Sequence, residues 1–440
     1  MQKENYELDF RGPNLFVIIS CFSIAAYVLF KLSVYPVSKL HLEVIFILFF
    51  LGGIYSRPWQ LKHDVAIRLI VLGVFLPLIF FIFNYWSDSS LAAKYFSLDK
   101  LVKLMGFSAI GFWLGGSLKN IYIFLSIVFL GLIVALFNVD TVEALKQIFS
   151  GERVDFDIHN AQHTAMYFGL AIIAFLSFYK DLLISQLAKK VKLLSTLIFM
   201  CALTVVTIVF IGAQTRASIL AMDIAFVLSV VHFVIHYFKK GSDKSIIILF
   251  LIYLFLASIV LSFSTNNVLI KRGSEPLVTK NLLEGKTKNI AMTSLGVRVN
   301  TWIEAGKWIK EKPLHGWGGR VRTHVIQDSN FSDDIKEHYG HFHNSYVEFT
   351  LAYGLIGLLY VLFIYYWVNK HIYLLSSHSA RYRGVWYFTL YGSVFMAIIN
   401  VFESYIFFRS GVYATAVLLA PAYSLYLSNI YNSLKKHNEI

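Results

Sequence analysis

Cysteine and charge are the two features that this sequence has least of. Its 440 residues include two cysteines, Cys21 and Cys201, and both lie inside apolar runs, which argues against a disulfide framework and a thiolate metal site. Only 15% of the residues are charged and 57% are hydrophobic. Soluble domains average about 25% charged and about 45–50% apolar residues. The composition therefore favours a polytopic membrane protein over a soluble domain.

Acidic residues are also scarce, with 26 against 39 lysines and arginines, which gives a net charge of +13. A nucleic-acid-binding protein would gather such cations on a soluble face. Here they lie mostly in short stretches between apolar runs, where they orient a membrane protein. We therefore expect a membrane-lipid environment and no nucleic-acid partner.

Apolar runs recur along the whole chain at about 20 residues, the length that crosses a ~30 Å hydrocarbon core. They predict an all-α polytopic membrane protein with about 12 transmembrane helices. The predicted spans are 14–32, 40–55, 66–85, 101–118, 120–137, 161–179, 191–212, 217–238, 245–263, 344–368, 384–402 and 412–431.

The distribution of cations predicts the orientation. Lysine and arginine concentrate in alternate short loops and at the C-terminal end, which places both termini in the cytoplasm. Residues 1–263 then carry nine spans, 264–343 form one large loop on the outer side of the membrane, and 344–440 carry the last three. Within the loop, apolar residues from Leu295 to Ile309 recur at helical spacing up to Pro313. This pattern predicts an amphipathic helix at the membrane surface.

Three ionisable residues are predicted to meet on the outer face. Arg216 begins the eighth span, Arg298 begins the amphipathic helix, and His343 ends the large loop. Ionisable groups at membrane depth cost several kcal/mol, so they tend to be functional or paired. The alternative for Arg216 is an interfacial anchor whose charged end reaches water.

From His343 the sequence reads His-Asn, then nine residues, then Gly354-Leu-Ile-Gly357. This resembles the H-[NSQ]-x9-G-x-x-G signature of bacterial O-antigen ligases, whose superfamily also holds O-antigen polymerases and protein O-oligosaccharyltransferases. The resemblance extends to the span count, the large loop and the W-x5-W…P-x-x-G-x-G run from Trp302 to Gly318. Leu358 departs from it, because the family usually has a small or β-branched residue there.

The resemblance implies an all-helical, GT-C-like glycosyltransferase of the bacterial inner membrane with a periplasmic active site. Its partners would be an undecaprenyl-diphosphate-linked O-antigen as donor and lipid A-core as acceptor. The family's functional residues correspond by position to Arg216, Arg298 and His343. Arginine binds phosphate through a bidentate fork, and histidine suits a general base. We therefore expect the arginines to bind the diphosphate and His343 to activate the acceptor hydroxyl.

Other polar residues near these three are candidate substrate contacts. The arginines would contact phosphate, unless they are simply solvated cations, and the histidines would contact sugar. The candidates are Arg272, Arg320, Arg322, His338, His341 and Asn344. His341 and His343 form an H-x-H pair that hints at zinc, but a zinc site needs a further ligand. We expect no metal and no cofactor.

Several residues and alternatives stay open at this stage. The roles of Asp223, Glu403, Arg409, His159 and His163 are undecided, and helix packing suffices to explain Gly354 and Gly357. A protein O-oligosaccharyltransferase or an O-antigen polymerase would use the same donor. The former are typically longer, with a soluble C-terminal part, which favours the ligase. A lipid-linked glycan flippase would show repeated halves and a midplane site, whereas these polar candidates gather at one face.

Overall fold

Helices make up all the regular structure in the part of the chain that the computed structural model describes, residues 14–33, 41–56, 62–183, 189–240, 290 and 292–437. The first half comprises α1 (Asn14–Phe30), α2 (His41–Ser56), α4 (Val65–Ser87), α5 (Ser89–Tyr95), α6 (Asp99–Lys103), α7 (Gly106–Leu114), α8 (Leu118–Ala135), η1 (Leu136–Asn138) and α9 (Thr141–Phe149). The second comprises α10 (Ala161–Leu183), α11 (Lys189–Gly212), α12 (Arg216–Lys240), α15 (Ser294–Glu311), α16 (Arg322–Gln327), α17 (Asp333–His338), α18 (Ser345–His378), η2 (Ala380–Tyr382), α19 (Arg383–Phe402), η3 (Tyr405–Phe407) and α20 (Arg409–Lys436).

Seven helices in the described ranges are long and apolar enough to cross a membrane, so the chain is a multi-pass membrane protein. All seven coincide with predicted spans, in α4, α8, α10, α11, α18, α19 and α20. Helices α1 and α2 are apolar but shorter, and α12 covers the predicted span 217–238 as one helix. The predicted span 245–263 lies outside the described residues.

The predicted span 101–118 is wrong as a single helix. The chain turns at Leu104 and Met105, and the following helix α7 ends at Gly115, which has a left-handed φ of 67°. At about 1.5 Å per residue, α7 is too short to cross the hydrocarbon core. It packs instead on α20, which is almost wholly buried, and a Cβ at Gly111 would meet the carbonyl oxygen of Ala420 at 2.6 Å. The absence of a side chain at Gly111 allows this close contact.

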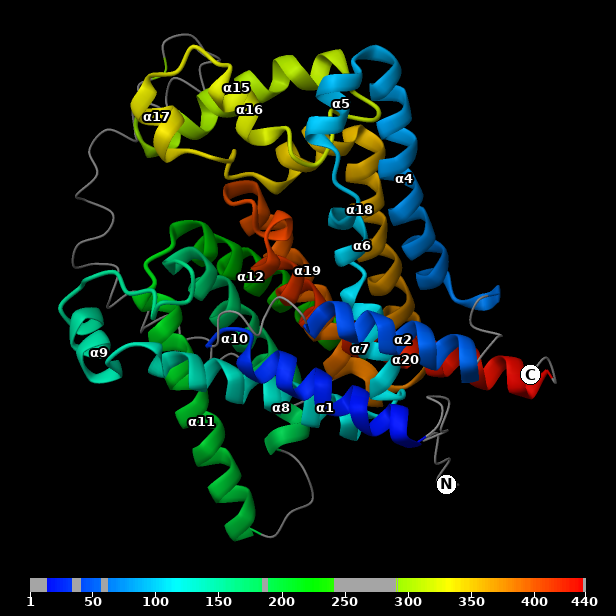
Figure 1. Cartoon of the computed structure of the whole chain (residues 1–440). Coiled ribbons are helices and arrows are strands. Elements are labelled where there is room, and N and C mark those ends of the chain that lie inside the picture. The colour runs from blue at the N-terminus through cyan, green and yellow to red at the C-terminus, as the bar shows by residue number, and fades with distance from the viewer. Residues whose placement is uncertain are drawn as a thin grey trace.

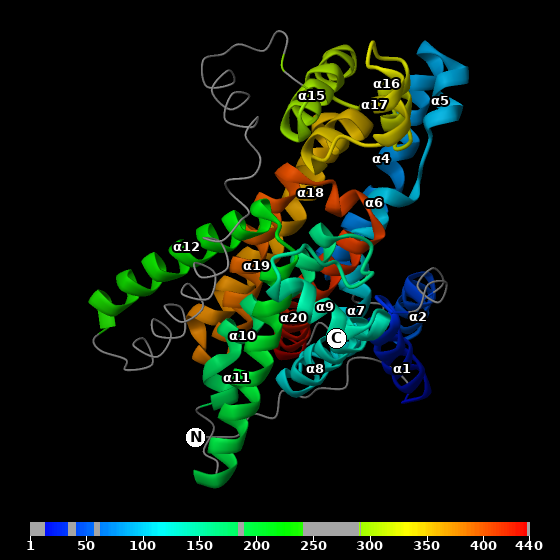
Figure 2. The same cartoon turned by 90° about the vertical axis from the view of Figure 1, so that its left-hand side faces the viewer.

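The described part of the large loop forms a cap over one end of the spans. Helices α15, α16 and α17 lie together beyond one end of α18, and the end of α4 with α5 stands beside them in both views (Figure 1, Figure 2). The predicted helix is confirmed as α15, but its tryptophans serve the cap: Trp302 Nε1 donates to the carbonyl of Phe342 at 2.7 Å, and Trp308 packs on Trp317. These contacts fix α15 to neighbouring segments of the cap.

The cap is joined to α18 at a break in that helix. Gly354 has φ 63° and ψ −169°, a conformation that is essentially restricted to glycine. The amide of Leu355 donates to the carbonyl of Pro313 at 2.8 Å, and the amide of Trp317 donates to that of Leu351 at 3.0 Å. A Cβ at Gly354 would lie 2.1 Å from the carbonyl carbon of Leu314. The expectation that packing suffices for Gly354 is therefore wrong, because its backbone conformation is also required.

Candidate active site

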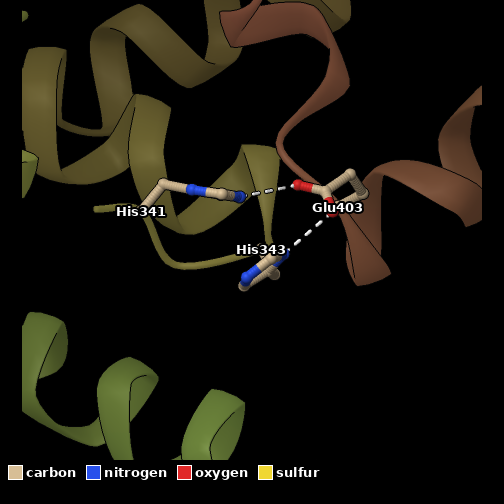
Figure 3. Close-up of side chains that lie close together, drawn as sticks. All are labelled: His341, His343 and Glu403. Atoms are coloured by element: carbon tan, nitrogen blue, oxygen red, sulfur yellow. Dashed lines mark hydrogen bonds and ion pairs between the residues drawn. The ribbon is translucent and has the colours of Figure 1, made fainter. Parts of the chain in front are cut away.

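Two histidines and one carboxylate meet where the cap adjoins the spans (Figure 3). His343 Nδ1 lies 2.8 Å from Glu403 Oε2, and His341 Nε2 lies 3.0 Å from Glu403 Oε1. The histidines precede α18, whereas Glu403 follows α19, so residues about 60 positions apart form one cluster. Glu403 is buried, and both imidazoles remain partly exposed.

The backbone around His343 is held by caps and cross-links. Asn344 caps α18, because its side-chain oxygen accepts from the amides of Tyr346 and Val347. The backbone amide of Asn344 in turn donates to the Ser404 hydroxyl at 3.1 Å, beside Glu403. The buried Asn344 is therefore a structural link between the two segments, and its predicted contact with substrate stays a prediction.

Glu348 forms a second link beneath the cluster. Its buried carboxylate accepts from the amide of Phe342 at 3.1 Å and from the hydroxyl of Ser404 at 2.6 Å. Arg322 pairs with the same carboxylate at 3.1 Å and lies over the Phe407 ring. The predicted phosphate ligand Arg322 is therefore engaged in an ion pair that holds the cluster's supports together.

The surroundings set the charge states of the cluster. Burial lowers the pKa of His343 below its ordinary value, and the hydrogen bond to Glu403 opposes that shift only in part. Burial raises the pKa of Glu403, but the hydrogen bonds to His341 and His343 outweigh it and hold that pKa well below the usual range. We therefore assign a Glu403 carboxylate and a neutral His343 that carries its proton on Nδ1. His343 Nε2 is then left as a proton acceptor.

Gln162, at the start of α10, connects the cluster to Arg298. In the amide orientation that satisfies both neighbours, its nitrogen donates to Glu403 Oε2 and its oxygen accepts from Arg298 Nη2 at 3.1 Å. A cleft of about 310 Å³ opens beside it, lined by Arg153, Asp155, Asn160, Ala161 and Gln162. Arg298 and His343, predicted to act together, are thus joined through Gln162 and Glu403.

Arg216 lies near this network, at the first turn of α12. The hydroxyl of the preceding residue, Thr215, is within 3.3 Å of the carbonyl of Ala161, next to Gln162. The start of α12 therefore lies beside the start of α10.

Two of the remaining predicted substrate contacts are exposed and lie beside other residues. His338 is exposed and bonds to Asp334, and Arg320 is exposed where its amide donates to the carbonyl of Tyr95. Arg272 lies outside the described residues.

Sequence reasoning missed Gln162 and Glu348 and left Glu403 without a role. Glu403 carried one usable signal, an acidic residue directly after an apolar span on the same predicted face as His343. Gln162 and Glu348 carried none, since their importance comes from contacts with distant segments.

The helices and the cluster together define a multi-pass membrane protein with a histidine–carboxylate site beside a cleft. Residues 197–362 match the family model described as O-Antigen ligase, which confirms the resemblance and supports the O-antigen ligase family for this chain. No curated protein matches the chain. The matched region includes Arg216, Arg298 and His343 but neither Gln162 nor Glu403. This match supports an activity of the O-antigen ligase or polymerase type in general.

Proposed function

We propose that this protein is an O-antigen ligase of the bacterial inner membrane. It transfers a polysaccharide from undecaprenyl diphosphate to a sugar hydroxyl of lipid A-core on the periplasmic face, without a metal. The observation that carries the proposal is the His343–Glu403 pair, linked through Gln162 to Arg298. A general base and a phosphate-binding cation thereby belong to one hydrogen-bonded network.

In this scheme the acceptor hydroxyl gives its proton to Nε2 of His343. Its oxygen attacks the anomeric carbon of the donor sugar, and the bond from that carbon to the diphosphate breaks. The diphosphate leaves with the bonding electrons, while the Glu403 carboxylate stabilises the imidazolium that forms. General-base catalysis of this kind contributes typically about 10²–10⁴-fold to the rate.

The arginines act on the leaving group. A diphosphate gains negative charge as the bond breaks, and fixed cations stabilise that charge in the transition state. Arg298 is held on α15 by the contacts that fix the cap, and Arg216 stands at the first turn of α12. Both are proposed to bind the diphosphate, with Gln162 keeping Arg298 in register with Glu403.

The test is reconstitution of the purified full chain with a lipid-diphosphate glycan and lipid A-core. We expect a larger lipopolysaccharide on a gel, and its loss in His343→Ala with donor binding retained. Product only with a periplasmic protein as acceptor would instead identify a protein O-oligosaccharyltransferase. Elongation of the donor glycan itself would identify a polymerase. Full transfer by His343→Ala would overturn the assigned base.

A further inference from the structure

The donor atoms of His341, His343 and Glu403 are arranged as a metal-binding site would be. One ligand atom from each lies within 4.8 Å of the other two. We propose that these three residues bind a divalent transition-metal ion such as Zn²⁺, and that the bound ion blocks glycan transfer. The blocking role rests on the function proposed above, whereas the binding site does not.

The distances between the donor atoms are compatible with metal coordination. Zinc bonds of about 2.0–2.2 Å, meeting at about 90–110°, separate neighbouring ligand atoms by roughly 2.9–3.5 Å. The two nitrogen–oxygen separations here, each to a different oxygen of Glu403, are 2.8 and 3.0 Å, and one ligand atom from each residue lies within 4.8 Å of the others. An ion can therefore enter with small side-chain movements. Two imidazoles and a carboxylate also form a donor set that suits zinc and related transition metals.

The site is held in place and is open on one side. Glu403 Oε1 accepts from the amide of Ser404 at 2.9 Å, which orients the carboxylate. The side chains of His341 and His343 are 25% and 18% exposed, so an ion can reach them from solvent. Three protein ligands leave a fourth position for water.

Metal binding at this position conflicts with the proposed role of His343. The ion takes the lone pair of Nδ1, so the proton that Nδ1 held in the neutral ring moves to Nε2. A ring that is metal-bound on one nitrogen and protonated on the other cannot accept a proton from the acceptor hydroxyl. No net proton is released, and the reaction itself stays metal-independent.

The binding test is calorimetric titration of the detergent-solubilised full chain, stripped with EDTA, with Zn²⁺. We expect one ion per chain. His341→Asn should weaken binding at least about tenfold, since even residues that only support metal ligands cost about 10–100-fold when lost. Glu403→Gln is a second, independent ligand variant, and size-exclusion chromatography reports whether each variant is folded. His338→Asn is the matched control, because that exposed histidine pairs with Asp334 on the same loop and should leave binding unchanged.

No stoichiometric binding, or equal binding by wild type and a folded His341→Asn, would overturn the site. The inhibitory role is tested in the reconstituted transfer assay, where Zn²⁺ should stop the reaction and EDTA should restore it. Relative to its own metal-free rate, His341→Asn should resist Zn²⁺. Binding with undiminished transfer would refute the inhibition. Stoichiometric zinc binding by a chain that makes no product even in EDTA would support the site and refute the proposed function.

Discussion

The Glu403→Gln variant offers the sharpest test of the histidine–carboxylate pair. Glutamine has nearly the same size, so it removes the negative charge while leaving the packing around Ser404 unchanged. A hydrogen bond to a charged group is worth about 1.5–3 kcal/mol, and each ~1.4 kcal/mol changes a rate tenfold. If the carboxylate stabilises the imidazolium in the transition state, kcat should fall by about 10–150-fold. The assay is single-turnover transfer to lipid A-core with saturating donor, in EDTA.

A pH profile separates this role from a purely structural one. His343 must be neutral to act as a base, so activity falls as the pH drops through its pKa. Burial lowers the pKa of His343 most, and the charges of His341 and Arg298 lower it further. The hydrogen bond and charge of Glu403 raise that pKa, but it stays below the usual histidine value. The acid limb should therefore lie below the usual histidine range and move to still lower pH in Glu403→Gln.

The control for this experiment is Asp334→Asn. Asp334 also pairs with a histidine, His338, but that pair is exposed on the cap. Its loss should leave the rate and the pH profile unchanged. A folded Glu403→Gln variant within about twofold of wild type, with an unmoved acid limb, would refute the assigned role.

Substitutions at Gln162, Gly354 and Arg322, two of them with a companion variant, test the supports of the site. Gln162→Leu removes the bridge between Arg298 and the Glu403 carboxylate. A loss of about 1–2 kcal/mol of transition-state stabilisation should lower the single-turnover transfer rate roughly 5–30-fold. An unchanged rate would contradict the bridge. Gly354→Ala should lower the free energy of unfolding by at least about 1–3 kcal/mol and so lower the melting temperature. Gly306→Ala in α15, where a Cβ meets nothing within 4 Å, should raise the free energy of unfolding by about 0.5–1 kcal/mol. Arg322→Ala should lower the free energy of unfolding by about 3–5 kcal/mol, because it leaves the buried Glu348 carboxylate without its partner cation. Adding Glu348→Gln should recover part of that loss. Additive losses of the two substitutions in thermal unfolding would contradict the pairing.

The sequence predicted well wherever one local property decided the outcome. Long unbroken apolar runs identified the seven spans, and helical spacing before Pro313 identified α15. It failed at 101–118, because apolarity alone does not reveal that a glycine-rich segment will turn twice and bury itself on α20.

The site divides in the same way. His343 was identified through its signature, which is a local pattern. Glu403 and Gln162 join it only through folding, across 60 residues in one case and through an amide bridge between α10 and α15 in the other. Composition and residue spacing do not predict such contacts between distant segments, so the network that joins His343 to Arg298 could be found only from the structure.

The break at Gly354 gives the spacing of the signature a physical meaning. Asn344 fixes the start of α18, and Gly354 fixes a point ten positions further on, with nine residues between them, where the backbone of the cap contacts the helix. The residues between them form a rigid spacer of about 13–14 Å with both ends fixed. Inserting or deleting one residue would turn one end against the other by about 100°. His343 would then face away from Glu403. The nine-residue spacing therefore sets both the distance and the rotation between the two fixed ends of this helical segment.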